Sequence, residues 1–228
     1  MNSTRYFSNQ DIPIAIGKKI TKPSGGIKNI IFDFGDIFIN LDKIEAMESA
    51  LELFDVTELT PEMIQVNMNY EKGDITTESF LTFYTNAYPN ISKTEIINTW
   101  NCMLLDFPLQ RLDFIKQVSK QYRCFLLSNT NEMHIDWIKK DWGTELYNEF
   151  KNCFEQFYLS HEMNMRKPDA DIYEFVLNEN NLIASETLFI DDTKENTDTT
   201  TSLGIHSWNL IPGKEDVIDL FNIKTDLF

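Results

Sequence analysis

Residues 27–33 read IKNIIFD, a short and largely apolar run that stops at a carboxylate. A run of this length with β-branched residues, bounded by turn residues, predicts a strand buried on both faces of a parallel sheet. Three later runs also stop at polar residues. They are residues 122–127 before Ser128 and Asn129, residues 157–159 before Ser160, and residues 187–190 before Asp191 and Asp192. Helical patterns lie between these runs, so we predict an α/β fold with a doubly wound parallel sheet.

One long segment, residues 43–106, interrupts this alternation. Helix-start signals follow one another there with no convincing strand: Asp42 and Ser92 each stand three residues before a Glu, and Thr60 precedes Pro61. Apolar residues recur after these signals at helical spacing. They are Ile44, Met47, Leu51, Phe54, Phe80, Phe83, Tyr84, Ile96, Trp100, Met103 and Leu104. We therefore predict a small all-helical subdomain at 43–106, inserted after the first strand of an α/β core that comprises residues 27–42 and 107–228.

The residues before the first strand, 1–26, are polar and end in the sequence KPSGG. They show neither a helical nor a strand period. We expect them to form a flexible N-terminal extension.

The composition describes an acidic but globular chain. Among 228 residues, 36 are Asp or Glu and 20 are Lys or Arg, which gives a formal net charge of -16, while hydrophobic residues make up 42%. That hydrophobic share is sufficient for a core, so the acidity belongs to a folded surface. Because nucleic acids and anionic membranes attract clusters of Lys and Arg, we expect neither as a partner.

Membrane spans and export signals are missing from the sequence pattern. No apolar run approaches the roughly 18 residues that a span requires, and the chain does not start with a charged region followed by an apolar stretch. The cysteines Cys102, Cys124 and Cys153 form no C-x-x-C pair and are interpreted as reduced, buried residues. These features predict a soluble, cytoplasmic protein.

Polar side chains gather at the ends of the predicted strands or in the loops that follow, where open α/β sheets bind ligands. They are Asp33, Ser128, Asn129, Lys167, Asp191 and Asp192. Taken singly, each has an ordinary explanation as a helix cap, a turn residue or a surface charge. Taken together, three carboxylates and one ammonium need a compensating cation. A hard divalent ion such as Mg²⁺ would provide it and would leave the site able to receive a phosphate dianion.

Four motifs, in order, resemble those of the haloacid dehalogenase-like superfamily. They are IIFDFG at 30–35, LLSNTN at 126–131, MRKP at 165–168 and FIDD at 189–192. The resemblance extends over about residues 27–212, and the predicted helices stand where members with a type 1 cap carry that cap. The wording LSNTN and RKP is most similar to the bacterial sugar-phosphatase branch that includes glucose-1-phosphate phosphatases. The resemblance implies a Rossmannoid core with a helical cap. It also implies a Mg²⁺-dependent phosphatase that acts on a small phosphorylated metabolite such as a sugar phosphate.

The resemblance also implies a role for each residue at the strand ends. Asp33 would be the nucleophile and would form an aspartyl-phosphate. The groups that bind the phosphoryl group and the substrate would be Ser128, Asn129 and Lys167, of which Ser128 and Lys167 would also be catalytic. The metal ligands would be Asp33, the carbonyl of Gly35, Asp192 and, through water, Asp191, which would alternatively hold Lys167.

The chain departs from the commoner family pattern at Gly35. Most phosphatases of the superfamily have an Asp there, which protonates the leaving alcohol. Asp36 would replace it only if the turn redirects its side chain, because neighbouring side chains of an extended segment point to opposite faces. Water or a group of the cap would otherwise supply the proton. The departure leaves a second hypothesis open, a regulatory protein that binds phosphate or a phosphorylated metabolite with little or no turnover.

Two further predictions concern single residues. Pro168, followed by Asp169 and Asp171, predicts a helix with Pro168 in its first turn. His134 is expected just beyond the Ser128 loop, where a surface or helix-capping role is favoured over contact with substrate. The sequence leaves the oligomeric state open.

Overall fold

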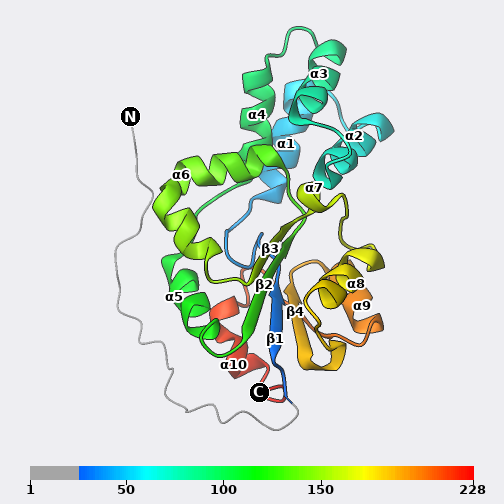
Figure 1. The fold of residues 1–228 in the computed structure, drawn as a ribbon. Coiled ribbons are helices and arrows are strands. Elements are labelled where there is room, and N and C mark those ends of the chain that lie inside the picture. Colours follow the sequence, from blue (N-terminus) through cyan, green and yellow to red (C-terminus); the bar gives the residue numbers. More distant parts are fainter. Residues whose placement is uncertain (1–25) are drawn as a thin grey trace.

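The computed structural model describes residues 26–228, and Figure 1 shows their arrangement. Except for Gly26, the predicted N-terminal extension lies outside these residues. Within them, five strands form one parallel sheet in the order β3-β2-β1-β4-β5. The strands are β1 (Asn29–Phe32), β2 (Arg123–Ser128), β3 (Gln156–Leu159), β4 (Thr187–Asp191) and β5 (His206–Asn209). The predicted α/β class with a parallel sheet is confirmed.

The central strand β1 is buried along its whole length. Ile30 and Phe32 point into one hydrophobic cluster, together with Leu126 of β2 and Leu188 of β4, whereas Ile31 points into a second cluster. This alternation follows from the period of two in a strand. Both faces of the sheet are therefore covered at its centre, which is why the central strands are largely apolar runs in the sequence.

Helices pack on both faces of the sheet (Figure 1). The larger cluster includes residues of α5 (Leu109–Val118), α6 (Glu132–Lys151) and α10 (Leu220–Ile223). The second cluster is built on α8 (Ala170–Glu179), and α9 (Lys194–Ser202) lies beside it. The shorter elements are α7 (Ser160–Met163) and two 3-10 turns, η1 (Ala184–Glu186) and η2 (Val217–Asp219).

Four helices lie between β1 and α5, the helix that leads back to the sheet at β2, and we call these four the helical insertion. They are α1 (Lys43–Phe54), α2 (Pro61–Lys72), α3 (Thr77–Ala87) and α4 (Lys93–Asn101). The predicted helix starts are confirmed, since Asp42 accepts from Glu45 N, Thr60 caps α2, and Ser92 forms a complete capping box. The insertion has a hydrophobic cluster of its own, to which the α/β part contributes Met133 of α6. Its division from the core at 42/43 and 106/107 stays a prediction.

Several details differ from the sequence prediction. Strand β5 was missed, because as an edge strand it buries only Trp208 and its neighbours are polar. Helix α8 begins at Ala170, so the placement of Pro168 in its first turn was wrong. Ile44 and Met47 lie on the surface, with exposed fractions of 73% and 47%, although their spacing predicted an inner face of α1.

Two further findings concern the cysteines and the apolar character of the helices. All three cysteines are free, and Cys124 is buried while Cys102 and Cys153 are half-buried. Among the helices of residues 26–228, none combines the length and the apolar character that a bilayer span requires.

Candidate active site

The predicted site residues converge at the carboxyl edge of the sheet. Phe32, the last residue of β1, pairs with Leu126 of β2 and with Ile190 of β4. The residues that follow on each strand therefore reach the same edge, and the backbone N–H of Asp33 donates to the Ile190 carbonyl at 2.8 Å. A crevice beyond the ends of parallel strands is where open α/β sheets bind their ligands.

Lys167 stands at the centre of this edge. Its Nζ lies 2.7 Å from Asp33 Oδ1 and 2.6 Å from Asp191 Oδ2, and only 1% of its side chain is exposed. A buried ammonium is stable only where carboxylates pair with it. Burial acts to lower the pKa of Lys167, but the charges of Asp191 and Asp33 outweigh it and hold that pKa above its ordinary value. Lys167 therefore remains a cation between two carboxylates.

Three carboxylates form a set of oxygen donors. One oxygen each from Asp33, Asp191 and Asp192 lies within 4.8 Å of the others. Burial raises the pKa of Asp33 to about 7, an effect that the charge of Lys167 opposes and the charge of Asp191 reinforces. Burial also raises the pKa of Asp192. The carboxylates are thus under-compensated, and a cluster of oxygen donors in need of positive charge fits a hard divalent cation.

Asp191 accepts hydrogen bonds from groups on α9 and on the loop before it. Its Oδ1 accepts from Thr193 N at 2.8 Å, and both its oxygens lie 3.0 Å from Asn196 Nδ2. These bonds and that to Lys167 occupy a side chain that is fully buried. Asn196 was not predicted from the sequence. Its only signal is its position in the first turns of α9, from which a side chain can reach back to the strand end.

Asn129 points its side chain toward the backbone of Lys167. Its Nδ2 donates to the Lys167 carbonyl at 2.8 Å, and its Oδ1 accepts from Lys167 N at 2.9 Å. Both ends of the amide are therefore used to hold the Lys167 loop, whereas the sequence interpretation had the side chain facing substrate. Ser128 Oγ makes only a long contact of 3.5 Å to the Asn129 carbonyl, which leaves it better placed to donate to a ligand. Contact of either residue with substrate stays a prediction.

A second lysine, Lys43 at the start of α1, also reaches the site. Its Nζ lies 2.6 Å from Asp192 Oδ2 and 2.9 Å from Asp36 Oδ2. Asp36 has a positive φ of 56°, and its Oδ1 accepts from Leu41 N at 3.0 Å. The turn does redirect Asp36, as the sequence required for a substitute acid, but both carboxylate oxygens have partners. The site thus contains two ammonium groups rather than the one that the sequence indicated.

Gly35 lies in close contact with Leu41. A Cβ added to Gly35 would stand 2.6 Å from Leu41 Cδ1, so a carboxylate at this position would require the Leu41 side chain to move. The turn after Asp33 is therefore packed for a residue without a side chain.

The helical insertion contacts the loops that carry the site residues. Arg166 Nη2 lies 3.1 Å from Glu71 Oε2 at the end of α2, and Ser160 Oγ donates to the Glu71 carbonyl at 2.5 Å. His134, near the start of α6, lies 3.1 Å through Nε2 from the Trp100 carbonyl of α4. Its ring thus joins two helices, a role that the sequence did not predict. These contacts place α2 against α7 and the loop that leads to Lys167, and they place α4 against the start of α6.

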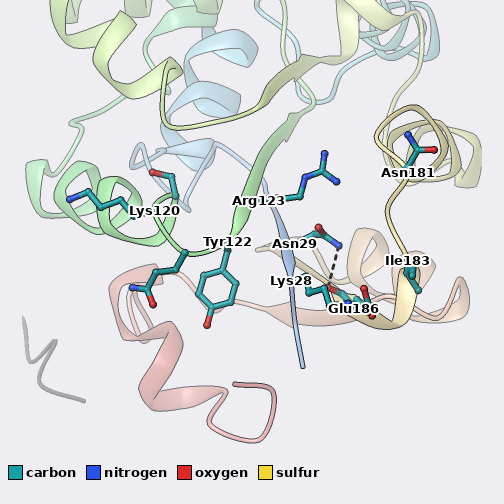
Figure 2. Close-up of a pocket in the computed structure, with 10 residues that line it drawn as sticks. Lys28, Asn29, Lys120, Tyr122, Arg123, Asn181, Ile183 and Glu186 are labelled. Atoms are coloured by element: carbon teal, nitrogen blue, oxygen red, sulfur yellow. Dashed lines mark hydrogen bonds and ion pairs between the residues drawn. The ribbon is translucent and has the colours of Figure 1, made fainter. Parts of the chain in front are cut away.

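A pocket of about 490 Å³ lies at the other end of the sheet (Figure 2). Its lining includes Lys28 and Arg123, at the amino ends of β1 and β2, far from Asp33. Both cations have partners, since Lys28 pairs with Glu186 at 2.6 Å and Arg123 pairs with Glu155 at 2.7 Å. The pocket shares no residue with the carboxylate cluster and carries no comparable chemistry.

Comparison with protein families gives a match over most of the chain. Residues 30–209 match the family described as haloacid dehalogenase-like hydrolase. The matched range starts within β1 and ends with β5, so it includes all the site residues and the helical insertion.

Known proteins with similar sequences and structures include a phosphatase and several HAD family enzymes. The chain is 26% identical over 187 residues to a D-ribitol-5-phosphate phosphatase of Bacteroides thetaiotaomicron, covering 80% of this chain and 91% of the relative. A crystal structure of HAD family enzyme BT-2542 of the same species aligns with a TM-score of 0.76 and 33% identity, covering 86% of this chain and 98% of that one. Its complex with magnesium and inorganic phosphate aligns with a TM-score of 0.73 and 32% identity, covering 83% and 97%. A predicted HAD-like hydrolase of Porphyromonas gingivalis, at 24% identity and a TM-score of 0.73 over 86% and 97%, shares the fold.

Proposed function

Because the chain belongs to the haloacid dehalogenase-like hydrolases, we propose that it is a Mg²⁺-dependent phosphatase that hydrolyses a small phosphomonoester through an aspartyl-phosphate on Asp33. The observation that carries this proposal is the cluster of Asp33, Asp191 and Asp192 around the buried Lys167. The similar BT-2542 enzyme forms a complex with magnesium and inorganic phosphate, which supports the same pair of ligands for this site.

The proposed metal ligands are Asp33, Asp192 and the carbonyl of Gly35, with Asp191 acting through water or by holding Lys167. Four carboxylates, those of Asp33, Asp36, Asp191 and Asp192, are opposed by only two ammonium groups. A bound Mg²⁺ would supply the missing positive charge and oppose the negative charge that builds up on the phosphoryl oxygens. Its ligand atoms are all oxygens, as this ion prefers.

Two displacements at phosphorus make up the proposed reaction. An oxygen of Asp33 forms a bond to phosphorus while the bond from phosphorus to the leaving alcohol oxygen breaks. Ser128 donates a hydrogen bond to a phosphoryl oxygen, and Lys167 keeps positive charge beside the nucleophile. A water molecule then attacks phosphorus, the bond to Asp33 breaks, and inorganic phosphate leaves with Asp33 restored as a carboxylate.

The leaving alcohol oxygen needs a proton, and Gly35 cannot supply one. Asp36 is engaged by Leu41 N and Lys43. We therefore propose that water, or a group of the helical insertion, protonates the leaving oxygen.

The substrate that we propose is a small sugar or polyol phosphate. The D-ribitol-5-phosphate phosphatase of Bacteroides thetaiotaomicron, similar over most of both chains, supports this class. The helical insertion would act as the cap that excludes bulk water from the reacting groups. The net charge of -16 supports a small-molecule partner over a nucleic acid or an anionic membrane, and three free cysteines support a cytoplasmic location.

A substrate panel tests the proposal. Release of inorganic phosphate is measured from D-ribitol 5-phosphate, glucose 1-phosphate and an aryl phosphate, with Mg²⁺ and with excess chelator. Replacing the nucleophile, Asp33→Asn, should lower turnover by at least about a thousandfold. Asp198→Asn is the matched control, because Asp198 is an exposed carboxylate paired with Lys194 on α9. Turnover that survives the chelator or Asp33→Asn would sink the mechanism.

The same panel distinguishes the second hypothesis, which the glycine at position 35 favours. An aryl phosphate has a leaving group that needs little protonation, so a competent Asp33 should turn it over in spite of Gly35. Saturable phosphate binding without turnover even of this ester would instead identify a phosphate-binding regulatory protein.

A further inference from the structure

Lys43 makes a bridge between two carboxylates at the mouth of the site. Its ammonium lies 2.6 Å from Asp192 and 2.9 Å from Asp36. The two carboxylates have only 11% of their side chains exposed, whereas 49% of the Lys43 side chain is exposed. One end of the bridge is therefore a half-buried carboxylate of the metal cluster, and the other is a carboxylate outside it.

The backbone around Lys43 holds the base of this side chain in place. Lys43 is the first residue of α1, directly after Asp42, which caps the helix through Glu45 N at 2.9 Å. The N–H of Asp42 donates to the Met103 carbonyl at 2.9 Å, and Asn40 N donates to the Asp106 carbonyl at 3.0 Å. The Cα of Lys43 is therefore anchored where the chain enters the helical insertion. The flexible side chain, with four carbons between Cα and the ammonium, allows the ammonium to reach either carboxylate.

Asp192 cannot bind the Lys43 ammonium and a divalent metal equally well at the same time. The Oδ2 atom that the ammonium contacts belongs to a carboxylate that we assigned to the metal in the proposed function, on which this inference rests. We propose that Lys43 is an internal cation that competes with the divalent metal for Asp192, and that Asp36 receives the ammonium when the metal binds. Lys43 and Asp36 thereby set the metal affinity of the site without being ligands themselves.

The two residues have opposite expected effects. Without Lys43, the metal no longer displaces an ammonium from Asp192 and meets less repulsion, so its affinity rises. Without the charge of Asp36, the ammonium loses its alternative partner and the site loses a nearby negative charge, so the affinity falls. Asp36→Asn is the suitable change, because the remaining amide oxygen can still accept from Leu41 N.

Calorimetric titration of the metal-free protein with Mg²⁺, checked by Mn²⁺ binding followed by electron paramagnetic resonance, tests this proposal without using turnover. Since a partly exposed ion pair contributes modestly, Lys43→Met should lower the dissociation constant by roughly three- to tenfold. Asp36→Asn should raise it, and this increase should be smaller in the Lys43→Met background. Lys43→Gln is the second variant, which keeps a polar side chain in case the methionine disturbs α1.

Lys93→Met is the matched control. Lys93 is another lysine at the first position of a helix in the insertion, and it pairs with Glu78 rather than with a site carboxylate. It should leave the dissociation constant unchanged. Unchanged or weaker binding in both Lys43 variants overturns the inference and leaves the proposed function intact, as does tighter binding in Lys93→Met to the same degree. A wild-type protein that binds neither ion overturns the metal-dependent function as well.

Discussion

Replacing His134 by glutamine should make the stability of the protein less sensitive to acid. The His134 ring joins α6 to α4, since the Trp100 carbonyl, which can only accept, lies 3.1 Å from Nε2. Nε2 therefore carries the proton, and Nδ1 accepts from Asn131 Nδ2 at 3.3 Å. Neutral imidazole satisfies both partners, whereas a charged ring would lose the bond to Asn131.

The size of the effect follows from the pKa. Burial, opposed by the bond to Trp100 and assisted by the charge of His161, lowers the pKa of His134 from 6.5 to about 4. Between these two values the unfolded chain binds a proton that the folded chain does not, so the free energy of unfolding falls as the pH falls. The contribution of His134 is complete above about pH 6.5, and the loss at pH 5 amounts to about 2 kcal/mol.

Urea unfolding at pH 8, 7, 6 and 5, in the presence of chelator, measures this loss. His134→Gln keeps a donor for Trp100 but cannot titrate. The stability advantage of the wild type over the variant should therefore shrink by about 2 kcal/mol between pH 8 and pH 5. Because other groups titrate equally in both proteins, the difference isolates His134. His206→Gln, at an exposed histidine of β5, controls for the loss of a histidine as such. A wild-type advantage that is constant over this range would refute the reasoning.

Three other changes have defined outcomes. Asn129→Ala removes both hydrogen bonds that hold the backbone of Lys167. The rate of phosphate release should therefore fall by roughly ten- to a hundredfold, and a rate near that of the wild type would contradict the positioning role of Asn129. Arg111→Met leaves Asp216 without its buried partner. The free energy of unfolding, measured in urea, should fall by about 3 kcal/mol, whereas a fall below about 1 kcal/mol would show that water replaces the ion pair. Gly73 has a φ of +77°, and Gly73→Ala would place a Cβ 2.0 Å from the His161 carbonyl of α7. The free energy of unfolding should therefore fall by more than about 1 kcal/mol, and an unchanged midpoint of thermal unfolding would contradict the contact.

The architecture could be predicted because its physical causes are local. Strands buried on both faces must be continuous apolar runs, and the run ending at Asp33 shows this directly. Helix starts such as Ser92 and Thr60 depend on hydrogen bonds only three residues away. Strand β5 escaped prediction since an edge strand with one buried residue has no such pattern.

The sequence also indicated that Asp33, Ser128 and Asp191 reach one edge of the sheet, because every parallel strand ends at the same edge. What Asn129, Asn196 and Lys43 do there was decided only by the tertiary structure. Asn129 holds a loop 38 residues away, and Lys43 contacts Asp192 across 149 residues. A polar side chain can choose among many partners, and its sequence neighbours do not reveal which of them the fold brings within hydrogen-bond distance. The resemblance of the four motifs therefore implied a phosphoryl-transfer site, while the second ammonium and the carboxylate that receives it became visible only once the chain was folded.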